Sequence, residues 1–183
     1  MTTKINNIGL VALYDDPRVA QTVLTLGQHL LAQQLGVVLT DDLQTPKGLD
    51  NVSTVPPEQL GEQCDLVIAV GGDGTMLHAA RLVAEHSVPL VGINRGQLGF
   101  LADVRPSVMT EKIDAILAGQ YIAEDRMMVR AELTKKDKSA TMFGLNDVVI
   151  KRIDTARMLE FDIFLNGKFL NSQAGDGLII ATP

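Results

Sequence analysis

The stretch LVIAVGGDGTMLHAARLVAE, residues 66–85, decides the fold of the N-terminal part of this chain. Its opening run, residues 66–70, is continuously apolar, which is typical of a strand buried on both faces of a parallel sheet. The glycines of GGDG, residues 71–74, end that strand, and a helix is predicted from about Met76 to Glu85. A strand that passes through a glycine-rich turn into a helix is the repeating unit of open α/β sheets, which bind ligands at the carboxyl ends of their strands.

The same pattern extends along the chain on both sides of this unit. Further buried strands are expected at 8–13, 37–39 and 90–93. The spacing of apolar residues predicts helices at about 19–35 and 107–118, and the first is expected to end near Gly36. The proline-containing stretch 41–57 is predicted to be a loop. Strands that alternate with helices predict a doubly wound, parallel α/β sheet for residues 1–120.

Beyond about residue 120 strands are predicted without helices of useful length between them. These strands are expected at 127–133, 143–151, 159–165 and 178–181. Asn166-Gly167 predicts a two-residue hairpin turn, because both residues accept the positive φ of a type I′ turn. We therefore expect an antiparallel, β-rich second domain over residues 121–183. Because an apolar strand is followed only by Thr182-Pro183, this second domain is expected to be truncated.

The charge and the apolar runs of the sequence indicate which kinds of binding partner and which cellular location are expected. The chain has a net charge of −6 and no basic stripe, so nucleic acid is not an expected partner. No apolar run reaches the ~18–20 residues of a membrane span, and the N-terminus lacks the apolar core of a signal peptide, so a cytoplasmic location away from membranes is expected. The single cysteine, Cys64, precedes an apolar run and is expected to be packed in the core.

Asp73 is the unusual member of the glycine-rich turn. Glycines at 72 and 74 allow close approach to a phosphate, and the free amides of the following helix favour an anion. A carboxylate there would repel phosphate unless it has a task, either accepting a proton from a hydroxyl or holding Mg²⁺ that bridges phosphates. The alternative is a simple turn, in which Gly and Asp are common.

Other candidates lie in later loops. Residues 94–101 (NRGQLGFL) follow the next strand and are expected at the same sheet edge, where Asn94 is a candidate for binding the nucleotide and the apolar side chains form either a pocket wall or a packing surface. Asn146-Asp147 combines an amide and a carboxylate suited to a base edge and ribose hydroxyls, or forms a turn at a strand start. Asp176 lies between two glycines and has the same character. Arg157 is placed to pair with a phosphate or with Glu160.

Four segments in a fixed order are similar to the NAD kinase family of bacteria. They are GGDGTML (71–77), GINRGQLGFL (92–101), LNDVVI (145–150) and DGLIIATP (176–183). The resemblance covers essentially the whole chain and implies an α/β domain followed by a β-rich domain. It also implies transfer of the terminal phosphate of ATP, or of inorganic polyphosphate, to the adenosine 2′-hydroxyl of NAD, with a divalent cation such as Mg²⁺ and with a homo-oligomeric full-length protein.

The resemblance also implies roles for individual residues. Asp73 matches the proposed general base, and Gly72 and Gly74 lie beside it against the nucleotide. Further dinucleotide-binding positions fall on Asn94, Asn146, Asp147, Arg157 and Asp176. The family continues beyond the Thr-Pro at which this sequence ends, so this polypeptide is expected to be inactive as it stands.

Two other hypotheses stay open at this point. GGDG loops also occur in lipid kinases of the diacylglycerol type, so a lipid hydroxyl is an alternative phosphoryl acceptor. A chain that binds nucleotide without catalysis is the second alternative, favoured by the strands that follow in the family and are absent from this sequence.

Overall fold

The computed structural model describes residues 4–13, 16–42, 45–96, 99–136, 138–153 and 158–183. The chain divides into two compact units, Met1–Arg126 (unit 1) and Met127–Pro183 (unit 2). The division falls a few residues after the boundary expected near residue 120. Residues 120–128 form neither helix nor strand, so the change of pattern near 120 marks the end of the last helix. None of the helices in the described part of the chain has the length and apolar character needed to cross a membrane.

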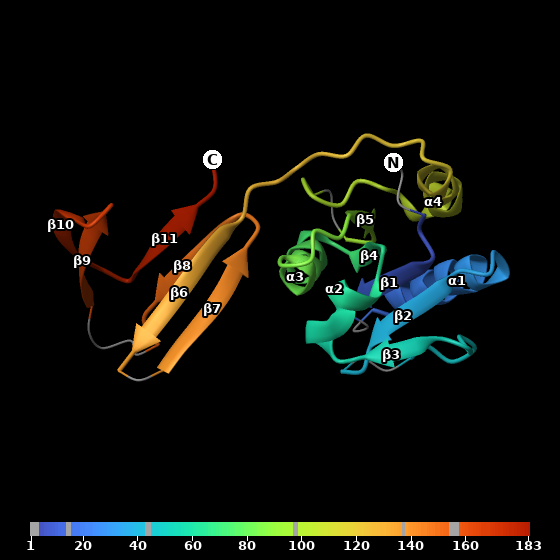
Figure 1. Ribbon diagram of the computed structural model, residues 1–183, viewed down its shortest axis with the longest axis horizontal. Coiled ribbons are helices and arrows are strands. Elements are labelled where there is room, and N and C mark those ends of the chain that lie inside the picture. Colours follow the sequence, from blue (N-terminus) through green and yellow to red (C-terminus); the bar gives the residue numbers. More distant parts are fainter. Residues whose placement is uncertain (1–3, 14–15, 43–44, 97–98, 137, 154–157) are drawn as a thin grey trace. The chain divides into compact units, whose positions relative to one another are not determined.

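Unit 1 is a five-stranded, all-parallel sheet with the strand order β3-β2-β1-β4-β5 (Figure 1). Its strands are β1 (Asn7–Ala12), β2 (Gly36–Thr40), β3 (Ser53–Val55), β4 (Leu66–Gly71) and β5 (Leu90–Asn94). Its helices are α1 (Pro17–Ala32), the short η1 (Pro57–Gln59) and α2 (Leu60–Gln63), α3 (Asp73–Val83), and η2 (Pro106–Val108) leading into α4 (Met109–Leu117). The predicted α/β fold is thereby confirmed.

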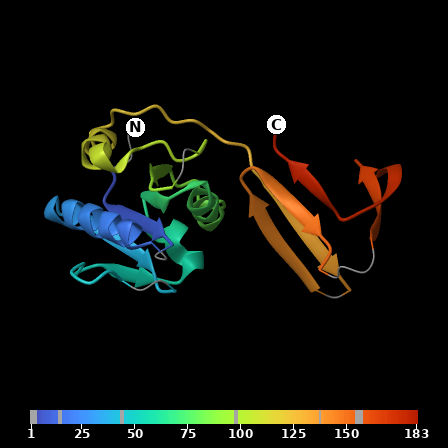
Figure 2. The ribbon, with the colours of Figure 1, turned by 180° about the vertical axis from the view of Figure 1, so that it is seen from behind.

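Helices cover both faces of the sheet, with α1 and α4 on one face and α2 and α3 on the other (Figure 1 and, from behind, Figure 2). The buried strand β4 divides its side chains between the two layers: Leu66, Ile68 and Val70 pack with the α1–α4 layer. Val67 and Ala69 pack with the α2–α3 layer. A continuous apolar run is therefore what a strand between two helical layers requires.

Cys64 lies in the α2–α3 layer, as expected, with an exposed fraction of 7%. Burial, and after it the neighbouring Asp65 carboxylate, raises the pKa of its thiol to about 12. The Cys64 sulfur lies only 3.0 Å from the position that a β-carbon at Gly9 would take, so the glycine in β1 lets the segment before β4 pack closely.

Two details of the N-terminal part differ from the sequence prediction. The stretch 41–57 is not wholly a loop, because residues 53–55 pair in parallel with β2 as the edge strand β3. The first helix was expected to end near Gly36, but it ends at Ala32, and Gln34, with a φ of 63°, takes the left-handed conformation after it. Gly36 is instead the first residue of β2.

Unit 2 consists of antiparallel strand pairs. Its strands are β6 (Val129–Lys135), β7 (Lys138–Gly144), β8 (Asp147–Lys151), β9 (Leu159–Leu165), β10 (Lys168–Gly175) and β11 (Gly177–Ala181). They form three two-stranded sheets, β6-β7, β8-β11 and β9-β10. The Asn166-Gly167 turn is confirmed, with φ values of 52° and 75° at the bend between β9 and β10.

The strand predicted over 143–151 is wrong in its extent. Residues 138–144 pair with β6 and residues 147–151 pair with β11, so the stretch contains the end of one strand and the whole of another. The chain leaves the first pairing at Leu145-Asn146, and the missing β-carbon of Gly144 lets the backbone of Asp147 lie close to it. Gly144 is also the only buried residue among those described in unit 2.

Candidate active site

The glycine-rich turn and the loop after β5 meet at the carboxyl edge of the parallel sheet. Gly71, the last residue of β4, is the pairing partner of Asn94, the last residue of β5. The backbone N–H of Arg95 donates to the Gly71 carbonyl at 2.8 Å and extends this pairing by one step. Gly72 then stands at the N-cap of α3, and Asp73 is its first residue. The two segments that the sequence placed at one edge are therefore brought together in space.

The Asp73 carboxylate is held by the loop after β5. Its Oδ2 accepts a hydrogen bond from the Phe100 N–H at 3.0 Å and its Oδ1 accepts one from the Leu101 N–H at 3.1 Å. These bonds, that of Phe100 first, hold the pKa of Asp73 below its ordinary value. Asp73 is therefore ionised at neutral pH, and part of its charge is compensated by backbone amides. Sequence reasoning identified Asp73 but missed these two donors.

The glycines around Asp73 differ in what they leave room for. A β-carbon at Gly99 would collide with the Asp73 carboxylate, so this glycine lets the loop close on it. A β-carbon at Gly72 or Gly74 would meet no atom within 4 Å. Gly72 has an extended backbone, with φ −105° and ψ −166°, so no special conformation demands a glycine there. The absent side chains at 72 and 74 instead leave open space on both sides of Asp73.

The start of α3 is suited to an anion. No side chain in the described part of the chain caps this helix. The carbonyl of Gly72 accepts from the N–H groups of Thr75 and Met76, both at 3.1 Å, which leaves the amides of the first two helical residues directed out of the helix. Together with the helix dipole, such amides attract phosphate.

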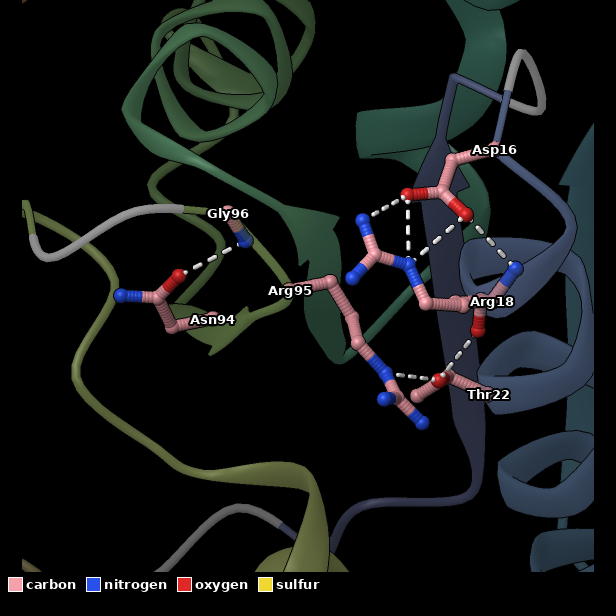
Figure 3. Close-up of polar contacts among 6 residues, drawn as sticks. All are labelled: Asp16, Arg18, Thr22, Asn94, Arg95 and Gly96. Carbon is pink, nitrogen blue, oxygen red and sulfur yellow. Dashed lines mark hydrogen bonds and ion pairs between the residues drawn. The ribbon is translucent and has the colours of Figure 1, made fainter.

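Asn94 and Arg95 are ordered at the same edge (Figure 3). The Asn94 Oδ1 accepts the Gly96 N–H at 2.9 Å, which fixes the start of the loop. The Arg95 side chain runs toward α1, where its Nε donates to the hydroxyl of Thr22. Thr22 is only 1% exposed and donates its own hydroxyl hydrogen to the Arg18 carbonyl at 2.8 Å.

The candidates in unit 2 lie on the β8-β11 ladder, at its two ends. Asn146 and Asp147 are at the end where Asp147 pairs with Ala181, and both side chains are exposed. Asp176 precedes the opposite end, where its carboxylate pairs with Arg152 at 3.1 Å. At about 3.3 Å per residue the five-residue strand keeps these positions roughly 15 Å apart. Arg157 lies outside the described residues.

In the described part of the site, a metal ion could be bound by the single carboxylate of Asp73 but not by a cluster of protein ligands. In the described ranges no group of three or more His, Cys, Asp or Glu side chains could hold an ion. Mg²⁺ commonly binds through one or two carboxylates, with substrate phosphates and waters completing its octahedron. The two carboxylate oxygens of Asp73 offer about four acceptor directions and the backbone amides of Phe100, Leu101 and Ala102 use at most three, so this residue fits such a shared ion.

The sequence of this chain is similar to a known protein family and to curated members of it. The family described as the ATP-NAD kinase N-terminal domain matches residues 8–121. A NAD kinase of Ectopseudomonas mendocina is 42% identical over 181 residues, which cover 98% of this chain and 61% of that protein. A NAD kinase of Nitrosococcus oceani is 40% identical over 177 residues, covering 96% and 60%. The chain thus spans about three fifths of the length of the curated relatives that it matches.

Solved structures agree on the fold. The crystal structure of yeast NADH kinase complexed with NADH superposes with a TM-score of 0.84 at 22% identity, covering 98% of this chain and 58% of that one. An NAD kinase from Archaeoglobus fulgidus in complex with ATP gives a TM-score of 0.65 at 20% identity, covering 96% and 60%. With the family match extending over most of the chain and over both segments that build the Asp73 site, the chain belongs to the NAD kinase family.

Proposed function

We propose that this protein is an NAD kinase, which transfers the terminal phosphoryl group of ATP or inorganic polyphosphate to the adenosine 2′-hydroxyl of NAD and so forms NADP. The observation that carries the proposal is the Asp73 carboxylate, held by two backbone amides at an uncapped helix start and flanked by two open glycines. The curated relatives are named NAD kinases, and the two solved relatives were crystallised with NADH and with ATP. These names favour a nicotinamide dinucleotide over the lipid acceptor of the alternative hypothesis.

Asp73 orients the acceptor hydroxyl in this proposal. The 2′-hydroxyl donates to the carboxylate, its oxygen attacks the terminal phosphorus, and the bond from that phosphorus to its bridging oxygen breaks with the electron pair leaving on the shortened donor. The hydroxyl proton passes to Asp73 and then to solvent. A carboxylate with a lowered pKa is a weak base. It is adequate here, because phosphoryl transfer has a loose transition state and depends mainly on positioning and charge stabilisation.

A divalent cation completes the proposed site. Mg²⁺, held by Asp73 and the phosphates, would neutralise charge that develops on the transferred group. The open space at Gly72 and Gly74 and the amides at the start of α3 then receive the phosphates themselves. Asn94 supports this edge, and Asn146, Asp147, Arg157 and Asp176 are proposed to contact the dinucleotide. We place the reaction in the cytoplasm.

Asp73→Asn tests the proposal. The variant keeps the shape of the side chain but cannot take the proton, so NADP formation by the full-length protein is expected to fall ~10²–10⁴-fold while NAD binding is retained. The measurement is a coupled assay for NADP alongside calorimetric titration with NAD. Asp50→Asn, at an exposed carboxylate outside the site, is the matched control. Turnover of Asp73→Asn within threefold of the unmodified protein would remove Asp73 from the mechanism.

A further inference from the structure

We propose that Arg95, held in place by Thr22, forms a phosphate-binding subsite for the polyphosphate chain of the donor. The inference rests on the proposed function for the identity of the donor, and on the geometry of the edge between β5 and α1 for the site itself. The same guanidinium chemistry would also suit the pyrophosphate of a dinucleotide, and the experiment below separates the two sources.

The backbone places Arg95 beside the glycine-rich turn. Its N–H donates to the Gly71 carbonyl at 2.8 Å, so the residue stands one step beyond the last pair of the β4-β5 ladder. The next residue along the loop is equally near, because a β-carbon at Gly96 would lie 3.4 Å from the Gly72 Cα. The backbone of Arg95 is therefore next to the turn that leads into α3, and its side chain extends from there toward Thr22 of α1.

The side chain is fixed by one of its five donors. Nε donates to the Thr22 hydroxyl, and that hydroxyl uses its own hydrogen on the Arg18 carbonyl, so its orientation is determined. Thr22 is almost fully buried in α1, which makes the anchor rigid (Figure 3). The two terminal nitrogens of Arg95 have no acceptor within the described part of the chain. A guanidinium that is already oriented, with both terminal nitrogens available, loses little freedom when it grips a phosphate with two parallel hydrogen bonds.

Among the described residues, Asp16 is a nearby carboxylate that could give Arg95 a purely structural role. It is already paired, since Asp16 accepts from the Arg18 Nε at 3.0 and 3.1 Å, from Nη2 at 2.6 Å and from the Arg18 N–H at 2.8 Å. Arg18, first through its side-chain hydrogen bonds, holds the pKa of Asp16 below its ordinary value, and Arg95 adds only a weak favourable effect. The charge of Arg95 is thus not cancelled by Asp16. In a chain of net charge −6, a fixed local cation is what a polyphosphate requires.

Calorimetric titration of the purified protein with inorganic tripolyphosphate tests the subsite. Arg95→Ala is expected to weaken binding at least tenfold. Arg95→Lys should recover only part of the affinity, because an ammonium can neither keep the Thr22 contact in the same geometry nor grip a phosphate with a fork. Thr22→Val, which removes the anchor and leaves the arginine, should give an intermediate loss. Arg81→Ala removes an exposed arginine at the far end of α3 and should leave binding unchanged.

Parallel titrations with NAD decide which ligand the subsite serves. Unchanged NAD affinity in Arg95→Ala, together with the loss of tripolyphosphate, supports a donor subsite; a loss confined to NAD overturns it. Tripolyphosphate affinity that is the same in Arg95→Ala, Arg95→Lys and the unmodified protein also overturns it, and circular dichroism of each variant shows whether the fold is kept. Because binding needs no turnover, a full-length protein that binds tripolyphosphate through Arg95 but makes no NADP would contradict the proposed function alone.

Discussion

Units 1 and 2 are both built on hydrogen-bonded strands, but only unit 1 buries the apolar side chains of its strands. Strands in both units are paired over most of their length. In unit 1 the pairing is enclosed by two helical layers that bury both faces. In unit 2 apolar side chains such as Ile150, Phe164 and Ile179 remain about half or more exposed. Hydrogen-bonded ladders and a hydrophobic core are therefore separable features of a fold.

The difference matters because the two features contribute unequally to stability. A hydrogen bond made in the protein replaces one made to water, so its net contribution is only about 0.5–1.5 kcal/mol, whereas burial of apolar surface is the dominant driving force. Isolated two-stranded hairpins are marginally stable in water at best. The edge-to-face contact between Phe164 and Phe169, with ring centroids 5.6 Å apart, stabilises one such hairpin locally but does not form a hydrophobic core.

The rate of amide hydrogen exchange is expected to differ more between units 1 and 2 than any other property. Amides of β4 exchange only when unit 1 unfolds, so at a stability of ~5–15 kcal/mol they should be slowed at least ~10³-fold. Amides of β9 and β10 should exchange within about tenfold of the unprotected rate, because their ladder lacks a core to hold it. Mass spectrometry of peptides from each unit gives both values. Comparable protection in the two units would show that unit 2 has a source of stability beyond its strand pairs.

Alanine substitutions of one buried and one exposed isoleucine measure how much side-chain burial contributes to the stability of each unit. Ile68, on β4, is completely buried, and Ile68→Ala is expected to lower the free energy of unfolding of unit 1 by about 2–5 kcal/mol through lost burial and a cavity. Ile179, on β11, is 67% exposed, and Ile179→Ala should change stability by no more than about 0.5 kcal/mol. Urea denaturation followed by circular dichroism measures both. A loss above 2 kcal/mol for Ile179→Ala would mean that this face is buried in solution.

The smallest effect expected is local to the loop that closes on Asp73. Because the pKa of Asp73 is lowered by the amides of Phe100 and Leu101, the carboxylate stabilises the loop fully above the ordinary aspartate pKa of about 3.9, and this contribution is lost as the pH falls through the lower, folded value. Exchange of those two amides, corrected for the intrinsic pH dependence, should quicken only in that acidic range. Asp73→Asn removes the titration and should show no such step; a step retained in the variant would assign it to another group.

The sequence predicted the strands and helices of unit 1 best where apolar residues form a continuous run. The apolar run of β4 and its glycine-rich turn define one strand, one helix start and the edge that carries Asp73. The strand β3 was missed because its first two residues, Ser53 and Thr54, are polar and exposed at the sheet edge. In unit 2, β7 begins with five exposed residues, and its pairing with β6 depends on the partner strand rather than on its own pattern.

Parts of the candidate site could not be predicted because they depend on tertiary register. Asp73 and the amides that bind it are 27 and 28 residues apart in sequence, and they meet only because β4 and β5 are neighbours in the sheet. Gly99 lies in the loop expected at this sheet edge, but only the structure shows that its close contact is with Asp73. The hydrogen bond between Arg95 and Thr22 joins residues 73 positions apart, and no pattern in either segment of the sequence indicates it.

The buried thiol of Cys64 can report how often unit 1 opens, independently of unit 2. At neutral pH Cys64 is protonated and shielded, so a thiol-specific reagent labels it only when the α2–α3 layer separates from the sheet. The sequence contains no other cysteine, so unit 2 contributes no background. The labelling rate of the unmodified chain therefore reports how often unit 1 opens, and a ligand that binds at the Asp73 edge would slow that rate in proportion to its occupancy.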